Sequence, residues 1–145
     1  QRSLLHLLKR YEDRWDWLAL LPATACGLLA VAVLNVNNIR DMESDRTAGK
    51  RSVPVRLGLV RARVYHWLLL ALALLCATAY VLLTFASLWQ FLYVLATPLL
   101  ARNGLAISRT PPPELPALNP WLKQMSLAAL AFAVLFGLGQ LLATL

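Results

Sequence analysis

The chain contains one long polar block, at residues 35–58, which reads NVNNIRDMESDRTAGKRSVPVRLG. Apolar segments flank the block on both sides, so it marks the place where the chain leaves one apolar helix and enters the next. Asp41 and Asp45 stand four residues apart inside it, and Lys50 and Arg51 follow shortly afterwards. We therefore expect the fold to present this block at the surface of an otherwise apolar scaffold.

The composition indicates an integral membrane protein. Of the 145 residues, 59% are hydrophobic and 14% are charged, whereas soluble domains average about 45–50% apolar and about 25% charged residues. The net charge of +7 is compatible with nucleic-acid binding, but the basic residues lie beside apolar segments, as in membrane proteins. We expect a lipid bilayer and no nucleic acid as partner. Cys26 and Cys76 form no CxxC pair, and we interpret them as packing residues.

Four apolar segments, at residues 17–36, 65–85, 86–101 and 121–144, predict four membrane-spanning helices, because about 20 residues cross a hydrocarbon core of about 30 Å. The expected fold class is all-α, a multi-pass helical bundle that forms a single membrane domain over residues 1–145. The third segment is short and contains Pro98. Aromatic residues near the segment ends are expected at the lipid headgroup level: Trp15, Trp17, Tyr65, Trp67, Trp89, Tyr93 and Trp121.

Residues 1–16 form an amphipathic segment. Leu4, Leu8, Tyr11 and Trp15 share one helical face, with charges on the other. Two interpretations remain open: a helix lying on the bilayer surface, or a connector whose apolar face packs on neighbouring helices. Because charges interrupt any apolar core in this segment, we do not expect it to be a signal peptide.

The distribution of basic residues predicts how the chain is oriented in the membrane. The loops at 37–64 and 102–120, counted as far as Lys123, hold ten of the 14 Lys and Arg residues. Both loops should therefore be cytoplasmic. The five prolines between Pro111 and Pro120 predict that the second loop is extended and irregular.

Asp41 and Asp45 share a helix face, where two carboxylates repel each other by a few tenths of a kcal/mol. A divalent cation bound between the two carboxylates would make their proximity favourable. Mg²⁺ prefers one or two carboxylates together with phosphate oxygens and water, and Asn37 lies one turn earlier on the same face. Cationic residues near the pair would neutralise phosphate charge: Arg46, Lys50 and Arg51. Gly49 would allow the turn that brings Lys50 back toward the metal.

A simpler interpretation is also open. Arg40 with Glu43, and Glu43 with Arg46, are i,i+3 ion pairs typical of a solvated loop. The position of the carboxylates, where an apolar helix leaves the bilayer, favours instead a ligand with a charged head and an apolar tail.

Four groups of residues carry a resemblance to a known family: Asn37-Asn38-Ile39-Arg40-Asp41, Asp45-Arg46, Gly49-Lys50-Arg51 and Val55-Arg56-Leu57-Gly58. Together they resemble the second aspartate-rich motif of the UbiA-type intramembrane prenyltransferases. Within that family they are most similar to the branch that prenylates 1,4-dihydroxy-2-naphthoate in menaquinone synthesis. The likeness extends less specifically through the three later spans and is poor over residues 1–16.

The resemblance implies an all-helical fold whose central cavity opens to the cytoplasm of a bacterial cell. In this family two aspartate-rich motifs hold Mg²⁺ on a polyprenyl diphosphate. Diphosphate leaves, the aromatic acceptor attacks the allylic cation, and in the naphthoate branch carbon dioxide is also lost. By resemblance, Asp41 and Asp45 are metal ligands, and the diphosphate contacts are Asn37, Arg46, Lys50 and Arg51. No catalytic base is assigned, and His6 and His66 are expected at the bilayer interface.

The chain departs from the family in one respect. Family members are longer and carry a first motif, NDxxDxxxD, in their amino-terminal half. The acidic residues outside the polar block do not match it: Glu12, Asp13, Asp16 and Glu114. The resemblance therefore covers the carboxyl-terminal half only, the missing half is an expected partner, and the isolated chain is expected to be inactive.

A different class of function remains open, namely a non-catalytic four-helix scaffold or lipid-binding subunit whose basic loops contact anionic lipid. Such binding would weaken with salt and need no divalent metal. A small transporter is disfavoured, because the spans lack intramembrane charges.

Overall fold

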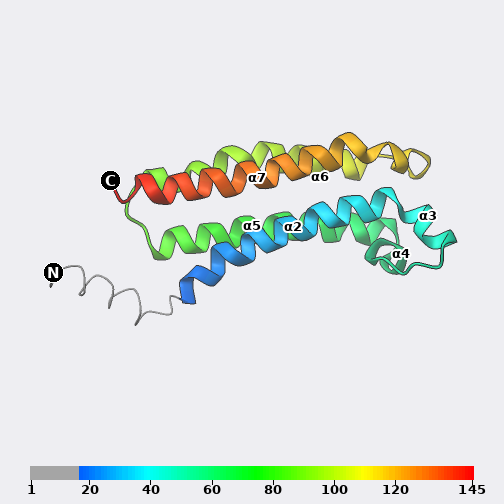
Figure 1. Ribbon diagram of the computed structural model, residues 1–145, viewed down its shortest axis with the longest axis horizontal. Coiled ribbons are helices and arrows are strands. Elements are labelled where there is room, and N and C mark those ends of the chain that lie inside the picture. The colour runs from blue at the N-terminus through cyan, green and yellow to red at the C-terminus, as the bar shows by residue number, and fades with distance from the viewer. Residues whose placement is uncertain (1–16) are drawn as a thin grey trace, which may run out of the picture.

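The computed structural model describes residues 17–145, and all its regular elements are helices (Figure 1). The all-α prediction is confirmed for this part of the chain, while the predicted amphipathic segment at 1–16 lies outside it. The elements are η1 (Trp17–Ala19), α2 (Leu20–Arg40), α3 (Met42–Thr47), α4 (Val53–Leu57), α5 (Leu59–Leu83), η2 (Leu88–Ala96), α6 (Thr97–Arg109), η3 (Pro112–Leu118) and α7 (Asn119–Leu142).

Four helical stretches are long and apolar enough to cross a membrane: Trp17–Arg40, Leu59–Leu83, Leu88–Arg109 and Pro112–Leu142. Their number agrees with the prediction, but their ends differ. The first continues four residues beyond the predicted end, and the second begins at Leu59 rather than at 65. A helix satisfies its own backbone hydrogen bonds, so it continues through polar residues where hydropathy has already fallen.

The third stretch is longer than predicted, because α6 continues η2 as far as Arg109. Pro98 does not break it. Pro98 lies in the first turn of α6, where the missing backbone N–H has no helical partner to lose.

The prediction of an extended second loop is wrong. Residues 102–109 complete α6, and the proline-rich segment forms the short helix η3. Proline fixes φ near −65°, which suits the first turn of a helix as well as an extended chain. Composition alone could not separate these two conformations.

The helices form two pairs that lie against each other (Figure 1). Helix α2 packs along α5, α7 packs along η2 and α6, and α2 also contacts α7. The short helices α3 and α4 lie at one end of the bundle together with the connection between α6 and α7. The two basic loops therefore share one end, as the predicted topology requires.

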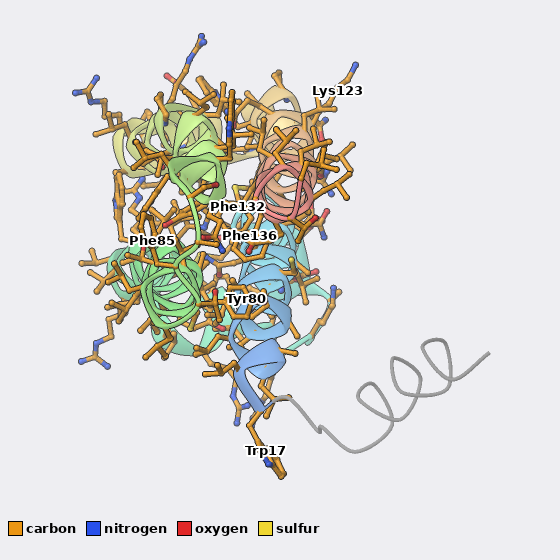
Figure 2. The ribbon with its side chains drawn as sticks, turned by 90° about the vertical axis from the view of Figure 1, so that its left-hand side faces the viewer. Trp17, Tyr80, Phe85, Lys123, Phe132 and Phe136 are labelled. Atoms are coloured by element: carbon orange, nitrogen blue, oxygen red, sulfur yellow. The ribbon has the colours of Figure 1, made fainter. Side chains whose placement is uncertain are left out.

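An aromatic cluster fills the opposite half of the bundle. Tyr93 lies against Phe132 and Phe136, with ring centroids 5.5 and 5.8 Å apart, and Tyr80 lies 5.7 Å from Phe136. Figure 2 shows Tyr80, Phe132 and Phe136 between the helices and Trp17 pointing away from them. Tyr93 is 1% exposed, so its predicted headgroup position is wrong. Its hydroxyl shares a 2.8 Å hydrogen bond with Thr78, which makes burial possible.

His66 is buried rather than interfacial, which corrects a second prediction. Its Nε2 lies 3.1 Å from the Asn103 side-chain oxygen. The Asn103 amide donates to the Trp121 carbonyl at 2.8 Å and to the Gln124 side chain at 2.7 Å. This polar network joins α5, α6 and α7. The sequence could not reveal it, because its members come from three separate helices.

Candidate functional site

The carboxylate pair lies where α2 passes into α3. Asp41 separates the two helices and has φ −92° and ψ 7°. Its N–H still donates to the Asn37 carbonyl at 3.1 Å, and the Asp45 N–H donates to the Asp41 carbonyl at 2.8 Å. The helical path therefore continues through the break. Asn37, Asp41 and Asp45 follow one another at intervals of one turn, as predicted.

Helix α3 ends in a Schellman motif. Gly49 has φ 73°, a conformation that costs a residue with a side chain about 1–2 kcal/mol. The Lys50 N–H donates to the Asp45 carbonyl at 2.8 Å, and the Gly49 N–H donates to the Arg46 carbonyl at 3.1 Å. This pattern reverses the chain, so that Lys50 returns over the turn that contains Asp45.

Lys50 also contacts the Asp45 carboxylate. Its Nζ lies 3.2 Å from Oδ1 of Asp45, whose side chain is 10% exposed. The other oxygen, Oδ2, is buried and has no hydrogen-bond partner in the part of the chain that the structure describes. A buried carboxylate oxygen without a partner is costly. It is therefore available to a further donor or a cation.

Asp41 has a different cationic partner. The Arg40 guanidinium donates from Nε to Oδ1 and from Nη2 to Oδ2, each at 2.7 Å. These hydrogen bonds, with a further contribution from the charge of Lys50, lower the pKa of Asp41 below its usual value. Asp41 is therefore ionised at neutral pH without a metal, and Lys50 acts electrostatically on both carboxylates.

Arg40 links this region to the start of α7. Its Nη1 donates to the side-chain oxygen of Asn119 at 2.7 Å, across 79 positions of sequence. This contact could not be predicted from the sequence, since Asn119 is 79 positions away from Arg40, in the proline-rich segment. For the pairing of Arg40 with Asp41, the only indication in the sequence is that the two residues are adjacent.

The residues present fit a magnesium site that a ligand must complete. Within residues 17–145, no group of three or more His, Cys, Asp or Glu residues is placed to hold a metal ion. Two carboxylates with a free buried oxygen nevertheless meet the preference of Mg²⁺ for hard oxygen donors, and phosphate oxygens and water commonly supply the remainder.

The other predicted contacts are arranged around this pair. Asn37 is partly buried one turn before Asp41, and Arg51 is exposed just after Lys50. Arg46 lies on the wall of a cavity of about 540 Å³ between α3, η3 and the start of α5. Arg40 and Glu43 also line this cavity, with an apolar wall that includes Leu59 and Leu115.

The simpler ion-pair interpretation holds only in part. Arg46 and Glu43 pair at 3.5 Å on the surface, where such pairs contribute little stability. The expected pairing of Arg40 with Glu43 does not form among the described residues, because Arg40 is bonded to Asp41 and Asn119.

Comparison with known proteins finds relatives that share one name. The chain is 46% identical over 123 residues to the 1,4-dihydroxy-2-naphthoate octaprenyltransferase of Haemophilus influenzae, covering 85% of the chain and 39% of that relative. It is 48% identical over 120 residues to the Escherichia coli protein of the same name, covering 83% and 38%. The Mycobacterium tuberculosis protein of that name is 38% identical over 89 residues, covering 61% and 30%.

The chain thus spans about two fifths of the length of the first two relatives. No solved structure matches it. The model of the UbiA prenyltransferase family matches residues 6–110, a stretch that contains the whole carboxylate block and the first three apolar helices. With its four candidate membrane-spanning helices, the chain is an integral membrane protein that belongs to the UbiA prenyltransferase family.

Proposed function

We propose that this chain is the carboxyl-terminal part of a Mg²⁺-dependent polyprenyltransferase. The complete protein would move a polyprenyl group from polyprenyl diphosphate to 1,4-dihydroxy-2-naphthoate in menaquinone synthesis. One observation carries the proposal: Asp41 and Asp45 keep their one-turn spacing at the polar end of α2, in a chain 46% and 48% identical to two enzymes named for that reaction.

Asp41 and Asp45 would hold the metal. Oδ2 of Asp45 is buried and has no hydrogen-bond partner among the described residues, and the hydrogen bonds from Arg40 lower the pKa of Asp41 and favour its ionised form. When bound, Mg²⁺ neutralises the diphosphate and favours its departure. The protein would hold the diphosphate in place and present its first carbon to the acceptor.

The cationic side chains would contact the diphosphate together with Asn37. The Lys50 side chain is 60% exposed beyond its contact with Asp45, so its ammonium group retains donors for a phosphate oxygen. Arg51 is exposed next to it. Arg46 would contribute from the neighbouring cavity, in which apolar side chains accompany the charges. We assign no catalytic base.

The position of the site suits an amphiphilic substrate. Carboxylates and cations lie at the end of helices whose flanks carry exposed leucine and valine side chains, such as Val31, Leu34 and Val64. A diphosphate could lie at this polar end while its isoprenoid chain extends along the apolar helices. The density of positive charge favours a cytoplasmic location for this end, in the inner membrane of a bacterium.

The exposed face of α2 supports the proposal that another part of the complete protein packs against it. In the most apolar stretch of this first membrane-spanning helix, 17% of the residues are buried inside the structure, compared with 28–33% in the other three. A Cβ at Gly27 would meet no atom within 4 Å, so a second helix could approach closely there. We propose that the amino-terminal half of the fold covers this face and supplies the first aspartate-rich motif, without which the chain is inactive.

The test is prenyl transfer by the full-length protein in membranes. Asp41→Asn and Asp45→Asn should each lower turnover by about 100-fold or more, because even residues that only support metal ligands are worth 10–100-fold. Glu114→Gln is the control, since Glu114 is an exposed carboxylate of η3 at the same end of the bundle and does not line the cavity. Both substituted proteins should still insert into the membrane.

Near-normal turnover in both variants would overturn the site assignment. The alternative is a lipid-binding scaffold, which is favoured by exposed basic residues at this end: Arg51, Arg56, Arg61 and Lys123. That function predicts binding to anionic vesicles that falls smoothly with salt and is indifferent to Mg²⁺.

A further inference from the structure

We infer that Arg40 and Asn119 act together as positioning residues that fix the orientation of the Asp41 carboxylate for a metal ion. The inference rests on the magnesium site proposed above and adds to it two residues with no assigned role. It also makes the geometry of that site depend on the placement of α7.

The first step is the geometry of the Arg40 contact. Two parallel hydrogen bonds of 2.7 Å join Nε and Nη2 to the two oxygens of Asp41. A bidentate contact of this kind fixes the plane of the carboxylate as well as its position. A carboxylate has about four lone-pair positions, so two remain open. The arginine therefore orients the carboxylate and leaves it able to bind a cation.

The second step is that Arg40 is itself held. Arginine has a long, flexible side chain and would adopt several conformations alone. Here Nη1 donates at 2.7 Å to the side-chain oxygen of Asn119, in the first residue of α7. The Arg40 side chain is 22% exposed. Three guanidinium nitrogens thus have hydrogen-bond partners, with the Asn119 contact at the exposed surface, and the series of contacts from Asn119 through Arg40 to Asp41 is continuous.

Lysine could not replace this arrangement. An ammonium group is a point charge without the planar fork, so it would retain the charge beside Asp41 and lose the orientation. The effect of Arg40→Lys on metal binding therefore distinguishes a positioning role of Arg40 from a purely electrostatic one, in which lysine would serve equally well. It also distinguishes positioning from competition, in which Arg40 would occupy the place of the metal and its loss would strengthen metal binding.

The experiment measures Mn²⁺ binding to the full-length protein in lipid nanodiscs, by the electron paramagnetic resonance signal of free Mn²⁺. Mn²⁺ stands in for Mg²⁺ at oxygen-ligand sites. Arg40→Lys should weaken binding by about 10-fold, at the lower end of the range for residues that orient metal ligands, and Asn119→Ala, which acts through Arg40, by a smaller factor of about 3–10. The double variant should bind no more weakly than Arg40→Lys, because Asn119 acts through Arg40.

Arg61→Lys is the matched control, since Arg61 is exposed near the start of α5, at the same end of the bundle. It should leave Mn²⁺ binding unchanged. In turnover assays, Asn119→Ala should raise the Mg²⁺ concentration needed for half-maximal rate and leave the rate at saturating Mg²⁺ within about twofold. A purely structural defect would instead lower the amount of active protein at every Mg²⁺ concentration.

Unchanged or tighter Mn²⁺ binding in Asn119→Ala would overturn the inference, as would additive effects in the double variant. Asn119→Ala retains every charge, so it tests the inference even if Arg40→Lys does not fold. The proposed function fails separately: if neither Asp41→Asn nor Asp45→Asn lowers the number of Mn²⁺ ions bound per protein or their affinity, these two carboxylates are not metal ligands.

Discussion

Lys50 contacts Asp45 twice, through its backbone N–H at 2.8 Å from the Asp45 carbonyl and through its Nζ at 3.2 Å from the Asp45 carboxylate. The first contact ends helix α3, and the second pairs the buried carboxylate with a cation. The hydrogen bonds that terminate the helix therefore also position a charge in the candidate site. Gly49 makes both contacts possible, because it provides the left-handed backbone conformation that lies between them.

Gly49→Ala should lower the free energy of unfolding by about 1–2 kcal/mol, because alanine is strained at positive φ. A Cβ at this position would meet no atom within 4 Å, so the loss would come from the backbone and not from a clash. Denaturation in mixed detergent micelles measures the change. Gly49→Asn should recover part of the stability, since asparagine tolerates this conformation. Equal losses in the two variants would contradict this explanation.

Gly139→Ala should be destabilising by about 1–3 kcal/mol, the usual range for overpacking. A Cβ there would overlap the Trp89 carbonyl oxygen, so α7 and η2 would have to separate. Gly137→Ala is the matched control on the same helix, because a Cβ at Gly137 meets no atom within 4 Å. The same denaturation assay should show little or no loss for the control. Similar losses at both positions would place the cause outside the contact with Trp89.

Asn103→Leu should lower the free energy of unfolding by about 1–2 kcal/mol, near the upper end for hydrogen bonds between membrane helices. The substitution removes the partners of His66 and Gln124 while keeping a similar side-chain volume. Ser126→Ala is the control, since the exposed Ser126 hydroxyl bonds only within α7. A loss in Asn103→Leu no larger than in the control would show that the network does not hold the helices together.

Acid should remove the stabilisation that Asp41 provides. Its pKa is lowered in the folded protein from a usual value of 3.8, so the folded state favours the ionised form. This stabilisation is complete above the unfolded pKa and disappears as the pH falls through the lower, folded value. In metal-free buffer, the difference in unfolding free energy between the protein and Asp41→Asn should be constant from about pH 5 to 8 and shrink below about pH 4. A difference that grows on acidification would have the wrong sign.

The backbone conformation of the candidate site depends on residues that are close in the sequence, so it could be predicted. The spacing of Asn37, Asp41 and Asp45 predicted that they would lie at successive turns, and the structure confirms it. The expectation that Gly49 returns Lys50 toward the carboxylates is also confirmed, because a Schellman motif involves only six consecutive residues. Roles in metal and diphosphate binding remain predictions for Asn37, Asp41, Asp45, Arg46, Lys50 and Arg51.

Partners distant in sequence could not be predicted. Tyr93 is expected near the headgroups because tyrosine is enriched there, and His66 is expected at the interface because it lies outside the motif; both are buried. Each is accommodated by a polar partner on another segment, Asn103 or Thr78. Hydropathy describes how a segment relates to lipid and carries no information about which side chains on two helices will meet.

The sequence by itself determined the class of fold, the number of apolar helices, the shared end of the two basic loops and the course of the carboxylate block, because these depend on composition and on contacts within a few residues. Only the tertiary structure decided that Asn119 reaches Arg40, that His66 is buried and that the proline-rich connection is helical at η3. Those features depend on how α2, α5, α6 and α7 pack against one another. Such packing depends on the complementary shapes of two facing helix surfaces, and these cannot be read from the residue pattern of either helix alone.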